Sequence, residues 1–327
     1  MLIKALKSIF RIIILFVICL GSIFVLVARP LFVEQVSTTI SPSINVEDLE
    51  RHVVYLSQKS VSRSADYPEN LKKVANYISR ELSLSSNDVS LQKFSVDSKE
   101  YANVIATFGP DSSEVIIIGA HYDAYSELPG ADDNASGVSG MIELAKLLAT
   151  LDLNLQVQLV AYTLEEPPFF ASKNMGSYIH AASIKDQNVK IMISLEMIGY
   201  FSDEMNSQTY PMKLMDIFYP NQGNFIAIVD SLTTNNAVDL KAAINKYTDL
   251  PAYSINAPKA VTGVDFSDHR NYWSFGFPAI MITDTSFYRN KAYHTAEDTY
   301  DRLNYDSMAK VVFGLFMYIK ELNEETS

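Results

Sequence analysis

The chain has 327 residues, of which 48% are hydrophobic and 20% are charged, and its net charge is −12. This is the composition of a folded globular protein, and it excludes a disordered or collagen-like chain. The acidic balance argues against a nucleic-acid partner, because binding to phosphates needs clusters of Lys and Arg.

An apolar segment near the amino terminus predicts one transmembrane helix at residues 9–28. It contains a single charge, Arg11, and at 1.5 Å per residue it is long enough to cross a hydrocarbon core of about 30 Å. A cleaved signal peptide is the alternative, but bulky Leu26 and the nearby Pro30 disfavour cleavage after small residues. The only cysteine, Cys19, lies in this segment, so the rest of the chain can form no disulfide.

The charges that flank this helix predict its orientation. Lys4 and Lys7 precede it, whereas only Arg29 closely follows it. Because positive residues stay on the cytoplasmic side, we expect residues 1–8 to form a short cytoplasmic tail. The rest of the chain would lie outside the cytoplasm, and we predict a single-pass protein of the bacterial inner membrane with its folded domain in the periplasm.

After a polar linker at residues 29–45, predicted strands alternate with predicted helices. This alternation indicates an α/β domain at residues 46–327, a three-layer α/β/α sandwich with a mixed, mostly parallel central sheet. The expected helices are 46–57, 68–82, 137–150, 172–182, 237–247 and 304–322, and the expected strands are 103–108, 114–119, 156–164, 190–196, 224–229 and 279–283. Residues 201–223 are expected to be irregular.

Side chains that bind divalent metals follow several of these strands. His121, Glu165, Glu166 and Glu196 each stand at the carboxyl end of a predicted strand, and His294 follows another strand after a short loop. Ligands of open α/β sheets bind at the carboxyl ends of the strands. Imidazole and carboxylate are also the ligands that catalytic zinc prefers. The pattern therefore predicts a metal-dependent enzyme.

Residues 130–137, Gly-Ala-Asp-Asp-Asn-Ala-Ser-Gly, precede a clear helical pattern. One interpretation is a helix cap, because Ser136 could bind the free N–H groups and aspartates are favoured by the helix dipole. Two consecutive aspartates, Asp132 and Asp133, exceed what capping needs. A metal ligand within this segment is the second interpretation.

Six segments in this order resemble the zinc aminopeptidases of peptidase family M28, and the resemblance extends from about residue 101 to residue 303. They are His121-Tyr-Asp123, Gly130 to Gly137, Glu165-Glu166, Glu196-Met-Ile-Gly199, Ser267-Asp-His269 and Tyr293-His-Thr-Ala-Glu-Asp298.

The resemblance implies two Zn²⁺ ions as cofactors. His121 and Glu196 would hold one zinc, Glu166 and His294 would hold the other, and Asp133 would bridge them.

Glu165 would be the general base of this enzyme. The three ligand carboxylates and Glu165 carry four negative charges, which two Zn²⁺ ions would balance. Two metals can activate a bridging water and polarise the scissile carbonyl group. Glu165 would take the proton from that water and pass it to the leaving amine.

Further residues of the motifs would support the ligands. A metal-bound imidazole usually donates its other nitrogen to a carboxylate, and Asp123 is the candidate for the first histidine ligand. Asp298 is expected to support the loop that carries the second histidine ligand, and Asp268 and His269 to shape the site without touching metal. Capping a helix or stabilising a loop is the alternative role for Asp298, Asp268 and His269. Tyr293 would donate to the oxyanion.

Three positions depart from the family pattern, so the resemblance does not fix the specificity. Glu196 stands where many relatives have Asp, and residues 167–170, Pro-Pro-Phe-Phe, replace a turn rich in Gly and Leu. Val264 occupies the position of an oxyanion tyrosine in some aminopeptidases, which moves that role to Tyr293.

The sequence thus predicts a membrane-anchored, two-zinc aminopeptidase that acts on peptide substrates. A glutaminyl-cyclase-like acyltransferase with a single zinc is the alternative enzyme. A catalytically inactive binding protein with the same fold is the alternative from another class. Nothing in the sequence indicates an oligomeric state.

Overall fold

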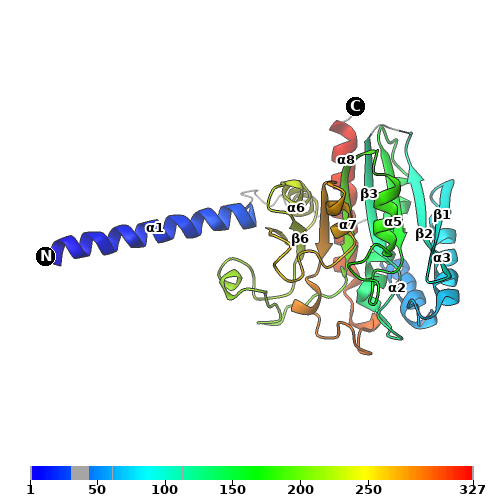
Figure 1. Cartoon of the computed structure of the whole chain (residues 1–327), viewed down its shortest axis with the longest axis horizontal. Helices are drawn as coiled ribbons and strands as arrows, with labels where there is room; N and C mark the ends of the chain where they lie inside the picture. Colours follow the sequence, from blue (N-terminus) through cyan, green and yellow to red (C-terminus); the bar gives the residue numbers. More distant parts are fainter. Residues whose placement is uncertain (1, 31–43, 61, 112–113, 326–327) are drawn as a thin grey trace.

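The computed structural model describes residues 2–30, 44–60, 62–111 and 114–325. A single eight-stranded sheet lies between two layers of helices, and a long amino-terminal helix, α1, projects from one end of the domain (Figure 1). The predicted three-layer α/β/α sandwich is therefore confirmed.

The sheet has the strand order β1-β2-β4-β3-β5-β8-β6-β7. Strands β4, β3, β5 and β8 are parallel neighbours, β6 and β7 are parallel to each other, and the other neighbouring pairs are antiparallel. The strands are β1 Asp88–Val96, β2 Lys99–Phe108, β3 Glu114–His121, β4 Gln156–Tyr162, β5 Asn188–Glu196, β6 Ile226–Asp230, β7 Ala252–Asn256 and β8 Ala279–Thr283.

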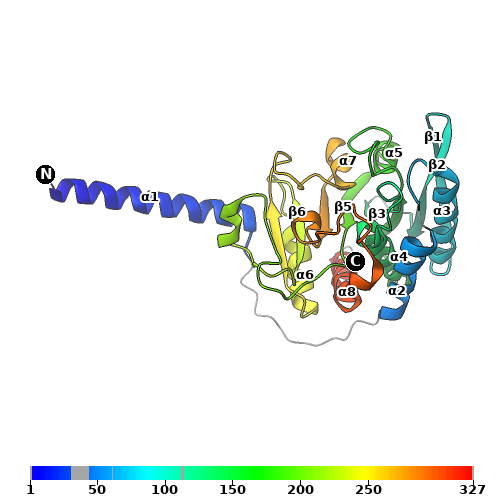
Figure 2. The same ribbon diagram turned by 90° about the horizontal axis from the view of Figure 1, so that it is seen from below.

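Helices cover both faces of this sheet (Figure 2). Helices α3, α4, α6 and α8 lie on one face with α2 packed against α4 and α8, whereas α5 and α7 lie together on the other face. The helices are α1 Leu2–Ala28, α2 Val46–Val54, α3 Pro68–Leu82, α4 Gly137–Leu148, α5 Gly176–Ser183, α6 Asn236–Tyr247, α7 His269–Ser274 and α8 Tyr305–Glu325.

Local signals in the sequence set some of these helix ends. The side chain of Asn45 accepts the backbone N–H of Glu47 at 3.0 Å, which caps α2. Pro68 begins α3, at a position where its missing N–H costs no hydrogen bond. In contrast, the helix expected at 172–182 begins only at Gly176, so its first predicted turn is irregular.

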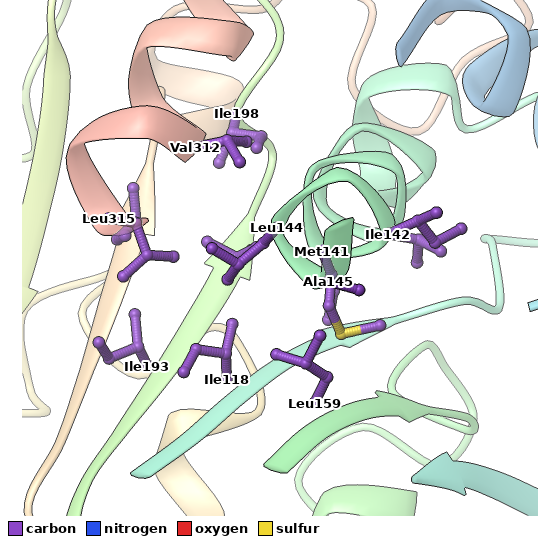
Figure 3. Close-up of a cluster of buried hydrophobic side chains, with 14 of the residues drawn as sticks. Ile118, Met141, Ile142, Leu144, Ala145, Leu159, Ile193, Ile198, Val312 and Leu315 are labelled. Atoms are coloured by element: carbon purple, nitrogen blue, oxygen red, sulfur yellow. The ribbon is translucent and has the colours of Figure 1, made fainter. Parts of the chain in front are cut away.

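The hydrophobic core follows the alternation of side chains along the central strands. Ile118 of β3 lies in register with Leu159 of β4 and Ile193 of β5. All three are fully buried, and Figure 3 shows them facing Leu144 of α4 and Leu315 of α8. Burying one such leucine stabilises the fold by about 2 kcal/mol. This contact fixes α4, and with it the loop that precedes it, over the ends of β3 and β5.

Three elements were not expected from the sequence. Strand β1 forms one edge of the sheet and β7 the other, and the short helix α7 begins at His269, the last residue of the Ser267-Asp-His269 segment. Most side chains of β1 are exposed or half-buried, so the strand lacks the apolar run that marks a buried strand.

The predicted membrane helix at 9–28 lies within α1, which also includes most of the residues that we assigned to the cytoplasmic tail. Its segment Leu6–Ala28 is long and apolar enough to cross a membrane. At its carboxyl end, the buried ammonium of Lys241 donates hydrogen bonds to the backbone carbonyls of Ala28 and Arg29, at 3.0 and 2.6 Å. Most of the predicted linker, residues 31–43, lies outside the described residues.

Candidate metal centre

The sheet topology brings the strand-end residues together. His121 is the last residue of β3, Glu196 is the last residue of β5, and the pair Glu165 and Glu166 follows β4. Because β4, β3 and β5 are parallel neighbours, their carboxyl ends lie at the same edge of the sheet. His294 reaches this edge from the loop after β8, with a left-handed φ of 55°.

Asp133 lies between two imidazoles. It belongs to the turn just before α4, where its backbone is not helical, with φ −102° and ψ 93°. Its Oδ1 is 3.3 Å from Nε2 of His121, and its Oδ2 is 3.1 Å from Nε2 of His294. Each oxygen of one carboxylate thus faces a different histidine, which is the arrangement a bridging ligand requires.

Two groups of three ligand atoms share this carboxylate. One group is His121, Asp133 and Glu196, the other is Asp133, Glu166 and His294, and the ligand atoms within each group lie within 4.8 Å of one another. Nε2 of His121 is 3.3 Å from Oε2 of Glu196, and Nε2 of His294 is 3.2 Å from Oε2 of Glu166. The structure therefore places the five predicted ligands in two adjacent sets.

Several of these donor atoms lack hydrogen-bond partners within the protein, as expected for atoms that bind a divalent metal. Nε2 of His121, Nε2 of His294 and Oε1 of Glu166 are buried, yet none of them has a hydrogen-bond partner. Buried polar atoms are normally paired, so three unpaired atoms that converge with carboxylates fit a metal site. Nitrogen and carboxylate oxygen are also the donors of catalytic zinc sites.

The protonation of His121 can be deduced from its second nitrogen. Nδ1 lies 3.2 Å from the backbone carbonyl oxygen of Asp123. A carbonyl oxygen only accepts, so Nδ1 carries the proton and donates it. In the neutral ring, Nε2 then keeps its lone pair, which points towards Asp133 and Glu196 as a ligand atom would.

Several buried carboxylates lie close together at this centre, and the pKa values of Glu165 and Glu166 are raised. Burial and the neighbouring Glu196 and Glu166 raise the pKa of Glu165 well above its usual range, although His121 opposes the shift. Burial and the charge of Asp133 raise the pKa of Glu166 to about 7.

Contacts between the imidazoles and the carboxylates shift the pKa values of His294 and Asp133 in opposite directions. Burial alone would lower the pKa of His294, but Asp133 and Glu166 raise it to about 10. Burial alone would raise the pKa of Asp133, but contact with His121 and His294 lowers it. The protein thus gathers negative charge that cations would neutralise.

Asp123 does more than the sequence suggested. We expected its carboxylate to accept from His121, but the carboxylate oxygen is 3.6 Å from Nδ1 and the closer acceptor is the backbone carbonyl. The carboxylate instead accepts the backbone N–H groups of Glu165, at 3.2 Å, and Glu166, at 3.0 Å. It therefore holds the backbone of both glutamates.

The carboxylate of Asp298 binds the turn that carries Asp133, a role that the sequence did not suggest, and its support of the His294 loop stays a prediction. The Asp298 carboxylate accepts the backbone N–H groups of Asp132, at 3.0 Å, and Asp133, at 3.1 Å. The backbone carbonyl of Asp298 also accepts the N–H of Ala131. The chain folds back after His294, so Asp298 lies beneath the turn that carries Asp133.

The Ser267-Asp-His269 segment also lies beside the centre. Ser267 donates a hydrogen bond to Oε2 of Glu196 at 2.7 Å, a role that the sequence did not predict. Asp268 is fully buried, and burial raises its pKa to about 7. His269 donates to the backbone carbonyl of Val264 at 2.8 Å, so it fixes the segment before α7.

Two tyrosine rings stack on the imidazole of His294. The ring of Tyr293 stacks on His294 at 3.8 Å between centroids, and the ring of Tyr125 stacks on it at 4.2 Å. Tyr125 was not anticipated, because nothing in a lone tyrosine of a loop indicates its partner. The stacking fixes the orientation of the His294 imidazole. The oxyanion role of Tyr293 stays a prediction.

A buried arginine is the second unanticipated residue. Arg63 is fully buried and donates to the backbone carbonyls of Leu56, Tyr122, Pro129 and Gly130, at 2.5–3.0 Å. It joins the segment after His121 to the turn that contains Asp133, and it adds a positive charge beneath the carboxylates.

A deep apolar pocket of about 360 Å³ opens beside the ligands. The ligands form one end, and the walls are mainly apolar and aromatic. The pocket-lining residues include Phe170, Met215, Phe225, Val264, Phe266 and Met281. Two of these, Phe170 and Val264, are positions where the sequence departs from the family pattern, so these departures shape the pocket.

Comparison with known proteins agrees with this geometry. The chain is 50% identical over 278 residues to the uncharacterized protein YfbL of Escherichia coli, covering 82% of this chain and 86% of that protein. It is 28% identical over 238 residues to the probable aminopeptidase YDR415C of Saccharomyces cerevisiae, covering 67% of this chain and 57% of that protein.

Solved structures share the fold. The zinc aminopeptidase BSAP of Bacillus subtilis aligns with a TM-score of 0.68 at 13% identity, over 86% of this chain and 96% of that chain. The glutaminyl cyclase of Fimbriiglobus ruber aligns with a TM-score of 0.63 at 19% identity, over 85% and 95%. Residues 103–319 match the sequence profile of peptidase family M28. With this match over most of its length, the chain belongs to peptidase family M28.

Proposed function

We propose that this protein is a membrane-anchored aminopeptidase that uses two zinc ions. The observation that carries the proposal is the shared carboxylate of Asp133, whose two oxygens face two different histidines and complete two sets of ligand atoms. A site for one metal would need only one of these sets.

When bound, zinc supplies Lewis acidity, which makes water easier to deprotonate and draws electrons from a carbonyl oxygen. Glu165 belongs to neither ligand set, and its carboxylate oxygen is 4.0 Å from Nε2 of His121. From this place it takes the proton of the attacking water and delivers it to the nitrogen of the leaving amine. The N–H groups bound by Asp123 hold Glu165 at the required position.

The metal site and the apolar pocket bind different parts of a peptide. The walls formed by Phe170, Met215 and Phe225 suit an apolar side chain, since they exclude water from it. The names of the yeast relative and of the Bacillus structure support cleavage at the amino terminus.

The membrane anchor is α1. The charges Lys4 and Lys7 before its apolar segment and the single Arg29 after it favour a cytoplasmic amino terminus. The catalytic domain would then lie in the periplasm of a bacterial cell. The relative in Escherichia coli supports a bacterial origin.

The test combines metal content with product analysis on the full chain in detergent. We expect two zinc ions per chain and release of the first residue from a peptide with a free, apolar amino terminus. The same peptide with an acetylated amino terminus should stay intact. Cleavage of the acetylated peptide inside its sequence would refute an aminopeptidase.

Glutaminyl cyclase activity is the second candidate, because a cyclase has the same fold. One zinc per chain, with pyroglutamate formed from an amino-terminal Gln peptide and no amino acid released, would establish it instead. A binding protein without activity is the third, and the presence of Glu165 beside both ligand sets speaks against it.

A further inference from the structure

A short segment near α1 exposes apolar side chains. Residues 210–219 form a protruding loop around the 3₁₀ turn Lys213–Ile217. Met212, Leu214 and Ile217 are 47%, 41% and 72% exposed. A cluster of exposed apolar side chains on a folded domain marks a surface that something else covers.

This segment touches the outer end of α1. The ring of Phe218 stacks on the ring of Phe24, with centroids 4.7 Å apart. Phe24 lies four residues before Ala28, about 6 Å along the helix axis, and is inside the apolar segment Leu6–Ala28. Figures 1 and 2 both show the loop beside the end of α1.

The position of Phe24 fixes the depth of the loop, if α1 is the membrane anchor proposed above. A residue inside the apolar span lies at or below the bilayer surface, so Phe218, which stacks on it, lies there too. Lys213 and Tyr219 flank the exposed side chains. Aromatic and basic residues of this kind gather where proteins meet the interface of a membrane.

The base of the segment is firmly held. The hydroxyl of Tyr210 donates to the backbone carbonyl of Pro220 at 2.5 Å, and that of Tyr219 donates to the carbonyl of Ser254 at 2.8 Å. The exposed side chains therefore project from a fixed support.

We infer that residues 210–219 bind the outer surface of the bilayer that α1 crosses. A second copy of this chain could also cover an apolar surface, but it would not account for the contact with a helix in the membrane. Continuity with α1 favours lipid as the occupant.

The same segment forms part of the catalytic pocket. Met215 is buried and lines the pocket, together with Tyr210, Pro211 and Tyr219. Ser254 of β7 also lines the pocket, and its hydroxyl donates to the backbone carbonyl of Ala28 at the end of α1. One side of the segment thus faces lipid while the other side faces substrate.

This arrangement sets the substrate class of the proposed aminopeptidase: peptides whose apolar amino-terminal residues reside at the membrane surface. Such peptides are concentrated beside the pocket wall, and their apolar side chains move from the interface into an apolar pocket.

The binding of lipid can be measured with a fluorescent probe. In the full chain with Cys19→Ala, Ile217→Cys is labelled with an environment-sensitive dye and reconstituted in vesicles that contain nitroxide-labelled lipids. Leu84→Cys is the matched control, because Leu84 is apolar and 74% exposed but follows α3, at the opposite end of the domain from α1. We expect a blue shift and quenching at residue 217 and neither at residue 84. Equal emission from the two probes would overturn the inference.

Self-association has a different signature. A probe at residue 217 that is shifted to the blue but not quenched by nitroxide lipid, and that changes with the ratio of protein to lipid, would overturn lipid binding in favour of a second copy. A chain that does not float with vesicles would refute the anchor and this surface together.

An activity assay tests the substrate class separately. Ile217→Glu and the control Leu84→Glu are compared in vesicles on a short soluble peptide and on a peptide held at the vesicle by a carboxyl-terminal acyl chain. We expect Ile217→Glu to lower kcat/KM severalfold for the vesicle-bound peptide only. Equal kcat/KM for both variants would overturn the substrate class. If wild-type protein releases no amino acid from either peptide while the probe at residue 217 is quenched, the aminopeptidase proposal fails and the lipid-binding surface stands.

Discussion

The carboxylate of Asp298 accepts the backbone N–H of Asp133 at 3.1 Å and so holds the proposed bridging ligand in place. Replacing Asp298 with Asn should weaken zinc binding by about 10–100-fold, because Asn has one accepting oxygen and its NH2 group cannot accept the second of the two N–H groups. Competition with a chelator measures this affinity. Asp301→Asn, at an exposed position nearby, is the control and should bind zinc like the wild type.

Glu165 is the proposed general base, so Glu165→Gln should abolish proton transfer without removing a ligand. We expect kcat to fall by about 10²–10⁴-fold while the zinc content is unchanged. Metal analysis and turnover of a soluble peptide check both parts. The exposed Glu297→Gln serves as the control, and a Glu165→Gln enzyme with normal turnover would remove Glu165 from the mechanism.

Arg63 donates to four backbone carbonyls, and a lysine in its place cannot reach all of them. Each buried carbonyl left unpaired costs about 1–3 kcal/mol. Arg63→Lys should therefore lower the free energy of unfolding, measured with urea on the chain in detergent. Arg80→Lys, on the surface, should change it little. Equal stability of the two variants would show that the four hydrogen bonds contribute nothing.

His180 should make stability depend on pH. Burial lowers its pKa from 6.5 to about 4 in the folded protein. Between these values the unfolded chain binds a proton that the folded chain does not, so stability is complete above pH 6.5 and falls as the pH drops towards 4. The loss amounts to about 3 kcal/mol.

The variant His180→Gln has no titrating group here and can still bond to Tyr272, which lies 2.6 Å from the imidazole. We expect the Tm of the variant to fall less than the wild-type Tm between pH 7 and pH 5. A parallel fall would mean that His180 titrates alike in the folded and the unfolded chain.

The sequence predicted the position of the candidate metal site better than it predicted the residues that hold this site in place. His121 and Glu196 could be located because a buried strand has a clear apolar pattern and its end is well defined. Parallel neighbouring strands must bring such ends together, and the structure does so. The partner of Asp133 in each ligand set followed from the family motifs rather than from any local pattern.

Residues that act through the backbone could not be predicted in the same way. Arg63 bonds to carbonyl groups of three separate segments, and a carbonyl has no signature in the sequence. The contact of Asp298 with the Asp133 turn was not predicted, because nearness along the chain to His294 says nothing about how the chain folds back. Strand β1 was missed because an exposed edge strand needs no apolar run.

One feature of the sheet bears on how the enzyme could diversify. Ala227, Val229 and Met281, on β6 and β8, line the pocket. Among the described residues, loops and short 3₁₀ turns, rather than an α-helix, line the rest of the pocket over this part of the sheet. Insertions and substitutions in these loops can therefore change which peptides are accepted over evolutionary time, while the ligands at the strand ends and the core beneath them stay intact.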